Sequence, residues 1–126
     1  MDKEHKIMKV IFISGPYRST TEHGLYLNIE RAREEALFVW KSGGVALCPH
    51  TNTAFFGGEC PDEVWLSGDL ELLYLCDAIY MIPGWEKSSG AKAELQFSMD
   101  HGKRVIFSRD GVIEYLSVYH SGVAQR

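Results

Sequence analysis

The feature that most constrains the fold of this chain is a regular alternation of short apolar runs with longer segments of helical periodicity. The apolar runs are rich in β-branched and aromatic side chains and end at glycine, proline or polar residues, which is typical of buried strands. They occupy residues 9–14 (KVIFIS), 45–47 (VAL), 77–82 (DAIYMI) and 104–108 (RVIFS). Because parallel strands need crossover helices, the alternation predicts a parallel sheet with helices on both faces.

The helical segments fit between and after these strands. In the first, Thr20 or Thr21 can cap the start, and Gly43-Gly44 supplies the stop. The apolar side chains that share one face of that helix are Tyr26, Ile29, Ala32, Ala36, Val39 and Trp40. The four helices are predicted over residues 21–42, from 61 to about 75, 88–102 and, as a short last helix, near 112–119.

The size of the chain suits one compact domain. Its 126 residues, 45% of them hydrophobic, can form a single core. We therefore expect one domain over residues 1–126, with a charged and flexible lead at residues 1–8. Its fold class is a three-layer α/β sandwich with a parallel sheet of four to five strands.

Charge and cysteine content restrict the partners and the compartment. The net charge of −4 gives no basic footprint for a polynucleotide or an anionic membrane, and no apolar run reaches the length of a membrane span. The odd number of widely spaced cysteines and the absence of a signal-peptide pattern indicate reduced thiols in the cytoplasm. We expect a cytoplasmic protein that binds a small molecule, without polynucleotide or membrane partners.

In an open α/β sheet a ligand binds beyond the carboxyl ends of the strands. Here those ends are SGPYR (14–18), CPH (48–50), IPGW (82–85) and SRD (108–110), which mostly combine glycine or proline with polar or aromatic groups. The segment after the second strand (TNTAFFGGECP, 51–61) is too long for a plain connector. A small-molecule crevice is predicted at this edge.

Asp69 interrupts the apolar stripe of the second helix. Since an ionised carboxylate is costly to bury without partners, this group either forms structural hydrogen bonds or faces an internal site, and we favour the site. Glu71 is expected on the opposite, solvated face. The stripe itself consists of Trp65, Leu66, Leu72, Leu73 and Cys76.

Glu94 lies one turn into the third helix, which opens with small residues at Ser88-Ser89-Gly90-Ala91. The N–H groups of such a helix start attract anions, and Gly90 and Ala91 leave room for a ligand to approach. Glu94 lies on the same side and can point into the crevice. By pattern alone, a glutamate at such a position is more often an ordinary surface residue than a nucleophile, and a serine cap is common for structural reasons alone.

The segment after the first strand lacks the spacing of a phosphate loop or a dinucleotide-binding fingerprint. In it, Tyr17 can stack on a base, and Arg18 can bind a phosphate or be an ordinary surface residue. His50 is either near the ligand or a satisfied polar group. Cys48, His50 and Cys60 lack a fourth ligand at a recognised spacing, so we expect no metal.

These residues, in this order, resemble the nucleoside 2-deoxyribosyltransferase-like superfamily, including its small nucleotide N-glycosidase members and phage-associated relatives of uncharacterised function. The resemblance covers nearly the whole chain and implies a Rossmann-like or flavodoxin-like fold without a cofactor. The matching elements are ISGPYR (13–18), PH (49–50), GD (68–69), CDAI (76–79) and SGAKAE (89–94).

The resemblance implies a role for each matching residue. Glu94 attacks the anomeric carbon, and Asp69 holds a sugar hydroxyl or assists proton transfer. The chain has Ala91 where many relatives have a threonine. It also implies a homodimer or larger homo-oligomer, in which Ser117 or Ser121 of a neighbouring subunit completes the site. The substrate-binding residues that it implies, with those argued above, are Gly15, Tyr17, Arg18, His50, Ser89 and Gly90.

The expected function is therefore cleavage or exchange of the N-glycosidic bond of a nucleoside or nucleoside 5′-monophosphate, through a covalent glycosyl-enzyme on Glu94. A retaining scheme of this kind places the two carboxyl groups roughly 5 Å apart. The alternative is a non-catalytic nucleotide-binding module that uses the same crevice. A weaker alternative is an interaction subunit, for which Phe55, Phe56 and Trp85 are expected to be exposed.

Overall fold

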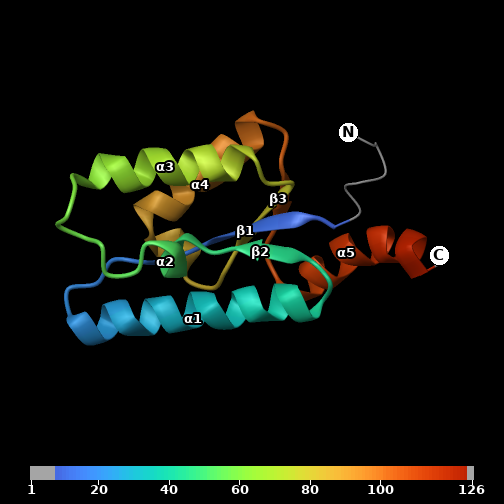
Figure 1. The fold of residues 1–126 in the computed structure, drawn as a ribbon, viewed down its shortest axis with the longest axis horizontal. Coiled ribbons are helices and arrows are strands. Elements are labelled where there is room, and N and C mark those ends of the chain that lie inside the picture. The colour runs from blue at the N-terminus through green and yellow to red at the C-terminus, as the bar shows by residue number, and fades with distance from the viewer. Residues whose placement is uncertain (1–7, 125–126) are drawn as a thin grey trace.

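The predicted alternation of strands and helices is present in the computed structural model, which describes residues 8–124 and the side chains of residues 8–119 (Figure 1). Most of the lead expected at residues 1–8 lies outside the described residues. The elements are β1 (Val10–Ser14), α1 (Glu22–Lys41), β2 (Val45–Leu47), α2 (Pro49–Asn52), α3 (Asp62–Tyr74), β3 (Ala78–Met81), η2 (Trp85–Lys87), α4 (Ser89–Asp100), β4 (Arg104–Ile106) and α5 (Arg109–Ala124).

The strands form a parallel four-stranded sheet in the order β2-β1-β3-β4. In the register of β1, Phe12 is level with Leu47 of β2 and with Ile79 of β3. The order reverses between β1 and β3, as in flavodoxin-like sheets, and this reversal is where such sheets bind ligands. The α/β fold class with a parallel sheet is confirmed.

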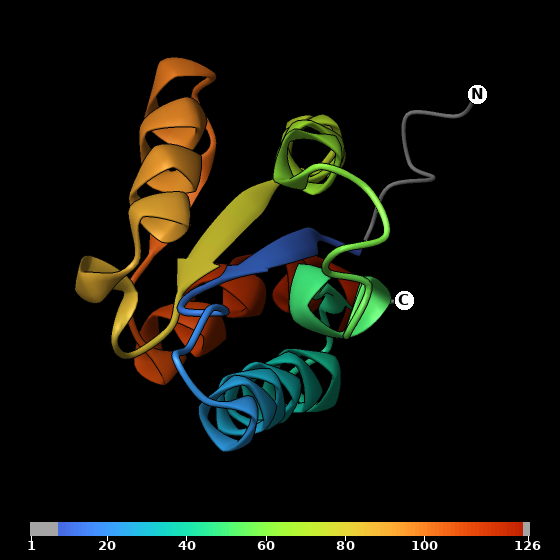
Figure 2. The same ribbon diagram turned by 90° about the vertical axis from the view of Figure 1, so that its left-hand side faces the viewer.

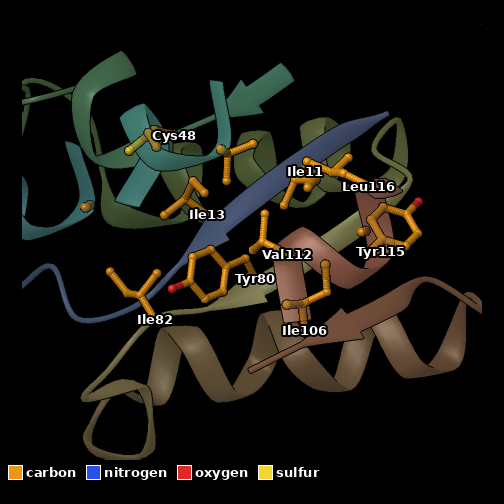
Figure 3. Packing of buried hydrophobic residues seen from close by; sticks show 13 residues of the cluster. Ile11, Ile13, Cys48, Tyr80, Ile82, Ile106, Val112, Tyr115 and Leu116 are labelled. Carbon is orange, nitrogen blue, oxygen red and sulfur yellow. The ribbon is translucent and has the colours of Figure 1, made fainter. Parts of the chain in front are cut away.

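Helices cover both faces of the sheet (Figure 2). On one face α1 and α5 pack against the strands through a core that includes Ile11, Val39 and Leu116 (Figure 3). On the other face α3 and α4 pack through a core that includes Phe12, Leu73 and Ala91. The molecule is therefore a three-layer sandwich.

The side chains of β1 alternate between these two cores. Ile11 and Ile13 belong to the core under α1 and α5, whereas Phe12 belongs to the core under α3 and α4. Because successive side chains of a strand point to opposite faces, Ser14 shares the face of Phe12. This alternation directs the last side chain of β1 toward α4.

The predicted helix caps are present. Thr21 caps α1 by accepting a hydrogen bond from the Gly24 N–H at 2.9 Å, and Ser88 caps α4 by accepting from the Ala91 N–H at 3.1 Å. Gly43, just beyond α1, has a φ of 95°, which is the left-handed conformation that favours glycine at a helix end. These local signals are strong enough to set the helix ends.

Some local expectations were wrong. The predicted polar loop after β2 begins with one helical turn, α2, in which Pro49 takes the first position. The turn η2 follows β3 where only a loop was expected. The last helix starts at Arg109 and continues to Ala124, well beyond the predicted range.

Two apolar stripes are narrower than expected. In α1 the central residues of the stripe are buried, but Tyr26 and Trp40 near its ends are about half exposed. In α3 Leu73 is buried, whereas Leu66 is exposed and lies at the pocket described below. The sheet is shorter than the helices, so the ends of a helical stripe extend past it. Within the described residues, no helix is long and apolar enough to cross a membrane.

Candidate active site

A pocket of about 390 Å³ lies at the carboxyl edge of the sheet, where the segments after β1, β2 and β3 meet α3. This volume falls in the range of about 300–1,000 Å³ that is common for small-molecule sites. The fourth strand end does not line the pocket; Arg109, which follows it, forms an ion pair with Glu35 of α1 at 2.9 Å. The structure brings every candidate site residue into this lining: Gly15, Tyr17, Arg18, His50, Asp69, Ser89, Gly90 and Glu94.

Glu94 is a partly buried ionisable group of the pocket. Its Oε1 accepts a hydrogen bond of 2.6 Å from the Ser14 hydroxyl, whose residue is fully buried at the end of β1. Burial is the main reason that the pKa of Glu94 rises from 4.5 to about 7; the Ser14 bond opposes this rise, and the charge of Asp69 adds to it. At neutral pH the carboxyl group is therefore divided between its two protonation states.

Asp69 reaches the same pocket from α3. Burial raises the pKa of Asp69 from 3.8 to about 6. Glu71, two residues along the helix, is exposed, which confirms the expected contrast between the two faces. The interruption of the apolar stripe thus places Asp69 at the pocket, although the separation of about 5 Å from Glu94 required by a retaining scheme stays a prediction.

The segment after β1 packs tightly against its surroundings. A side chain at Gly15 would collide with Ile82, so only glycine lets this segment pass so close to the end of β3. His50 Nε2 lies 2.9 Å from the Pro16 carbonyl oxygen, and because a carbonyl only accepts, this nitrogen donates. Burial lowers the pKa of His50, which favours the neutral ring.

His50 therefore both lines the pocket and makes a structural hydrogen bond. Its Nδ1 is buried and has no hydrogen-bond partner among the described residues. The ring also lies edge-on to Tyr17, with 5.6 Å between the ring centroids. The Tyr17 hydroxyl in turn accepts a hydrogen bond of 3.2 Å from the backbone N–H of Phe55.

Phe55 belongs to the long segment between α2 and α3. Its φ of 62° places it in the left-handed region, which is unusual for a bulky residue. Both Phe55 and Phe56 are exposed, as expected, whereas Trp85 is partly buried against the core and Phe107, so its expected exposure was wrong. The backbone N–H of Phe55, in this strained conformation, is hydrogen-bonded to the hydroxyl of Tyr17, which lines the pocket.

Arg18 and the start of α4 form the polar rim. The Arg18 guanidinium donates to Asp62 at 2.6 Å, and Lys87, Ser89 and Gly90 also line the pocket. Ala91 also lines the pocket, as expected, although it is only 1% exposed and packs in the core. Gly90 has the expected room, since a side-chain carbon there would meet nothing closer than 3.8 Å.

Several residues at the pocket, among them Ser14 directly behind its lining, were not among the sequence-based candidates. Ser14 stands at a strand end, a position that favours site residues, but its bond to Glu94 joins segments 80 residues apart. Asp62 was identified only as a helix start. Trp65 was assigned to the core stripe, yet it lines the pocket, and its indole nitrogen is buried without a partner among the described residues.

Other candidates lie elsewhere. Among the described residues, no group of three or more histidine, cysteine, aspartate or glutamate side chains could hold a metal ion. Ser117 is exposed on α5, outside the pocket lining, and its hydroxyl donates to the Glu114 carbonyl at 2.8 Å. The side chain of Ser121 lies outside the described residues. The homo-oligomer and its completing residue stay predictions.

Together, the fold and the site define a doubly wound α/β protein with two carboxyl groups in a small-molecule pocket at its switch point. The family model described as Domain of unknown function (DUF4406) matches residues 9–107, so the chain belongs to this family. A search of curated proteins gave no match.

Solved structures share the fold, and one of them illustrates the similarity. It is a 2-deoxyribosyltransferase from the psychrotolerant bacterium Bacillus psychrosaccharolyticus, described as a biocatalyst for nucleoside synthesis. The identity is 20%, the TM-score is 0.56, and the match covers 76% of this chain and 69% of that chain. This similarity confirms the fold that the resemblance implied.

Proposed function

We propose that this protein cleaves or exchanges the N-glycosidic bond of a nucleoside or nucleoside 5′-monophosphate through a covalent glycosyl-enzyme on Glu94. The observation that carries the proposal is the pair of partly buried carboxyl groups, Asp69 and Glu94, which line one pocket and whose pKa values are raised to about 6 and 7. Strongly perturbed carboxyl groups in a cleft mark functional sites, and a 2-deoxyribosyltransferase shares the fold.

In the proposed reaction an ionised Glu94 attacks the anomeric carbon. A bond forms between the carboxylate oxygen and C1′ while the bond from C1′ to the base nitrogen breaks, and the base leaves with its electron pair. The sugar carries positive charge in the transition state, which a carboxylate in a poorly hydrated pocket stabilises. Asp69 holds a sugar hydroxyl or passes a proton to the leaving base.

Ser14 supports this role of Glu94. Its hydroxyl donates to one carboxylate oxygen at 2.6 Å, which favours the ionised form and leaves the other oxygen for the attack. Many relatives have a threonine at the position of Ala91, and this chain therefore lacks that hydroxyl. Ser14, at the end of β1, gives Glu94 a hydroxyl donor from another element. The missing threonine is thus no obstacle to a positioned nucleophile.

The remaining lining residues would bind the substrate. Tyr17 can contact the sugar or base, while Arg18 and the start of α4 at Ser89 can contact a 5′-phosphate. The covalent intermediate then reacts with water, which gives hydrolysis, or with a second base, which gives transfer. Gly15 and His50 would hold the segment after β1 in place.

The direct test is turnover of a panel of nucleosides, deoxynucleosides and their 5′-monophosphates, with and without a free acceptor base. We expect base release or exchange by the wild type and none by Glu94→Gln, which keeps the size of the side chain. Trapping of a glycosylated protein by mass spectrometry would place the sugar on Glu94. Equal activity of the variant refutes the proposal, and tight nucleotide binding without turnover supports the non-catalytic alternative.

A further inference from the structure

The rim of the pocket carries an ion pair that joins two elements. Arg18, in the segment after β1, donates from Nη2 to Oδ2 of Asp62 at the start of α3, over 2.6 Å. Both residues line the pocket. The guanidinium group that a substrate phosphate would use is therefore already bound to a carboxylate of the protein.

This ion pair is easily exchanged. The two side chains are 72% and 53% exposed, and exposed pairs of this kind contribute only about 0–1 kcal/mol. A phosphate can offer Arg18 two oxygen acceptors at once, which is a stronger arrangement. A phosphate can thus replace Asp62 as the acceptor for Arg18, whereas an uncharged nucleoside offers no anionic group that could replace it.

Asp62 remains at the rim after such an exchange. The other rim groups favour an anion. Lys87 carries a positive charge, and the start of α4, which lines the pocket, carries the positive end of the helix dipole. A carboxylate about 4 Å from a phosphate charge opposes binding by about 1 kcal/mol per unit charge even in water. Asp62 is hence the rim group that opposes a phosphate.

We propose that Asp62 is a specificity-determining residue, which competes with a 5′-phosphate for Arg18 and thereby shifts the site from nucleoside 5′-monophosphates toward unphosphorylated nucleosides. This inference rests on the proposed function of the pocket. It makes the use of Arg18 for phosphate binding conditional, since the guanidinium must first leave Asp62.

The test measures the ratio of the dissociation constants of a nucleoside and its 5′-monophosphate by calorimetry. All proteins carry Glu94→Gln so that no ligand is consumed, and the ligands are the four common deoxynucleosides and their 5′-monophosphates. We expect Asp62→Asn to shift the ratio toward the monophosphate by about fivefold or more, since about 1 kcal/mol corresponds to that factor. Asp62 is exposed, so the variant should fold normally.

Two controls isolate the ion pair from general charge effects. Glu63→Gln removes the same charge from the neighbouring exposed residue, which lies outside the pocket lining, and should change the ratio less than twofold. In an Arg18→Gln background, Asp62→Asn should shift the ratio less than it does with Arg18 present, because the competition is gone and only the direct repulsion of the phosphate remains.

The outcomes separate this inference from the proposed function. If Asp62→Asn leaves the ratio of dissociation constants unchanged, or if Glu63→Gln changes it equally, the role of Asp62 is overturned even if the wild type releases base. A ratio that responds as expected, together with a wild type that releases no base from any ligand, keeps the role of Asp62 and overturns the proposed reaction. Failure of every ligand to bind overturns both.

Discussion

The charged groups at the two edges of the sheet differ in their partners and in their pKa values. At the amino edge three cations have partners: Lys103 donates to the Cys76 carbonyl at 2.8 Å, Lys9 lies 4.2 Å from the centroid of the Tyr119 ring, and Arg104 lies 5.4 Å from that of Tyr115. At the carboxyl edge, Glu94 and Asp69 are withdrawn from water with raised pKa values.

The difference separates stability from function. Cations paired with carbonyls or rings stabilise the fold. A carboxyl group buried without a cation costs stability and is kept where chemistry needs it. We therefore expect substitutions at the carboxyl edge to change activity, and substitutions at the amino edge to change only stability.

The largest expected effect is on the activity of the Glu94→Gln variant. If Glu94 is the nucleophile, kcat/KM should fall about 10³-fold or more, because the amide cannot form the glycosyl-enzyme. Base release measured by chromatography tests this. If the Glu94→Gln protein were active, the proposal that the carboxyl edge carries the activity through Glu94 would be wrong.

The same variant should be more stable than the wild type at neutral pH. The folded pKa of Glu94 is raised from 4.5 to about 7, so the folded state binds the proton more tightly, and its stability advantage is lost as the pH rises across that interval. Glu94→Gln should match the wild type near pH 4 and exceed it by up to about 3 kcal/mol above pH 7, at about 1.4 kcal/mol per pKa unit.

Urea denaturation of both proteins at several pH values measures this difference. A difference in the free energy of unfolding that does not change between pH 4 and pH 8 would contradict the burial of an ionisable Glu94.

Asp69→Asn should lower kcat by about 10²-fold, which is the usual size of a lost proton-transfer or hydroxyl-binding group. Glu71→Gln, which removes a charge from the exposed face of the same helix, serves as the control and should retain activity. Steady-state kinetics on the best substrate of the panel compares them. Equal effects of the two variants would mean that the stripe interruption has no special role.

Ser14→Ala should lower kcat/KM about tenfold, the order expected for a hydrogen bond to a charged group. The wild-type activity should rise with pH through about 7 as Glu94 ionises. The Ser14 hydrogen bond lowers the pKa of Glu94, so its loss in Ser14→Ala should raise this pKa and move the rise in activity to higher pH. Ser98→Ala is a matched control, because Ser98 is equally buried and its hydroxyl has no partner among the described side chains. An unshifted pH profile would reduce Ser14 to a packing residue.

The smallest effect is expected at the amino edge. Lys103→Met should lower the free energy of unfolding by about 1–2 kcal/mol through loss of its hydrogen bonds to backbone carbonyls at the end of α3. It should change kcat/KM less than twofold. Lys41→Met, at an exposed position near the end of α1, controls for the loss of a surface charge. A large loss of activity in Lys103→Met would break the division between the edges.

Local patterns were enough to predict most of the fold. The strands, the Thr21 and Ser88 caps and the Gly43 stop depend on neighbouring residues, so they are readable from a short stretch of sequence. The one-turn α2 and the true length of α5 were missed, because short or terminal helices carry little periodic signal.

The sequence by itself determined that the chain folds as an α/β sandwich, and that Asp69 breaks an apolar stripe next to a polar strand edge. Only the tertiary structure decided what each group faces, because contacts between distant segments follow from strand order and helix packing. Ser14 meets Glu94 since β1 lies beside the strand that precedes α4, and Arg18 meets Asp62 since α3 crosses over β1. The raised pKa of Glu94 likewise depends on its burial in the folded pocket, which no local sequence pattern contains.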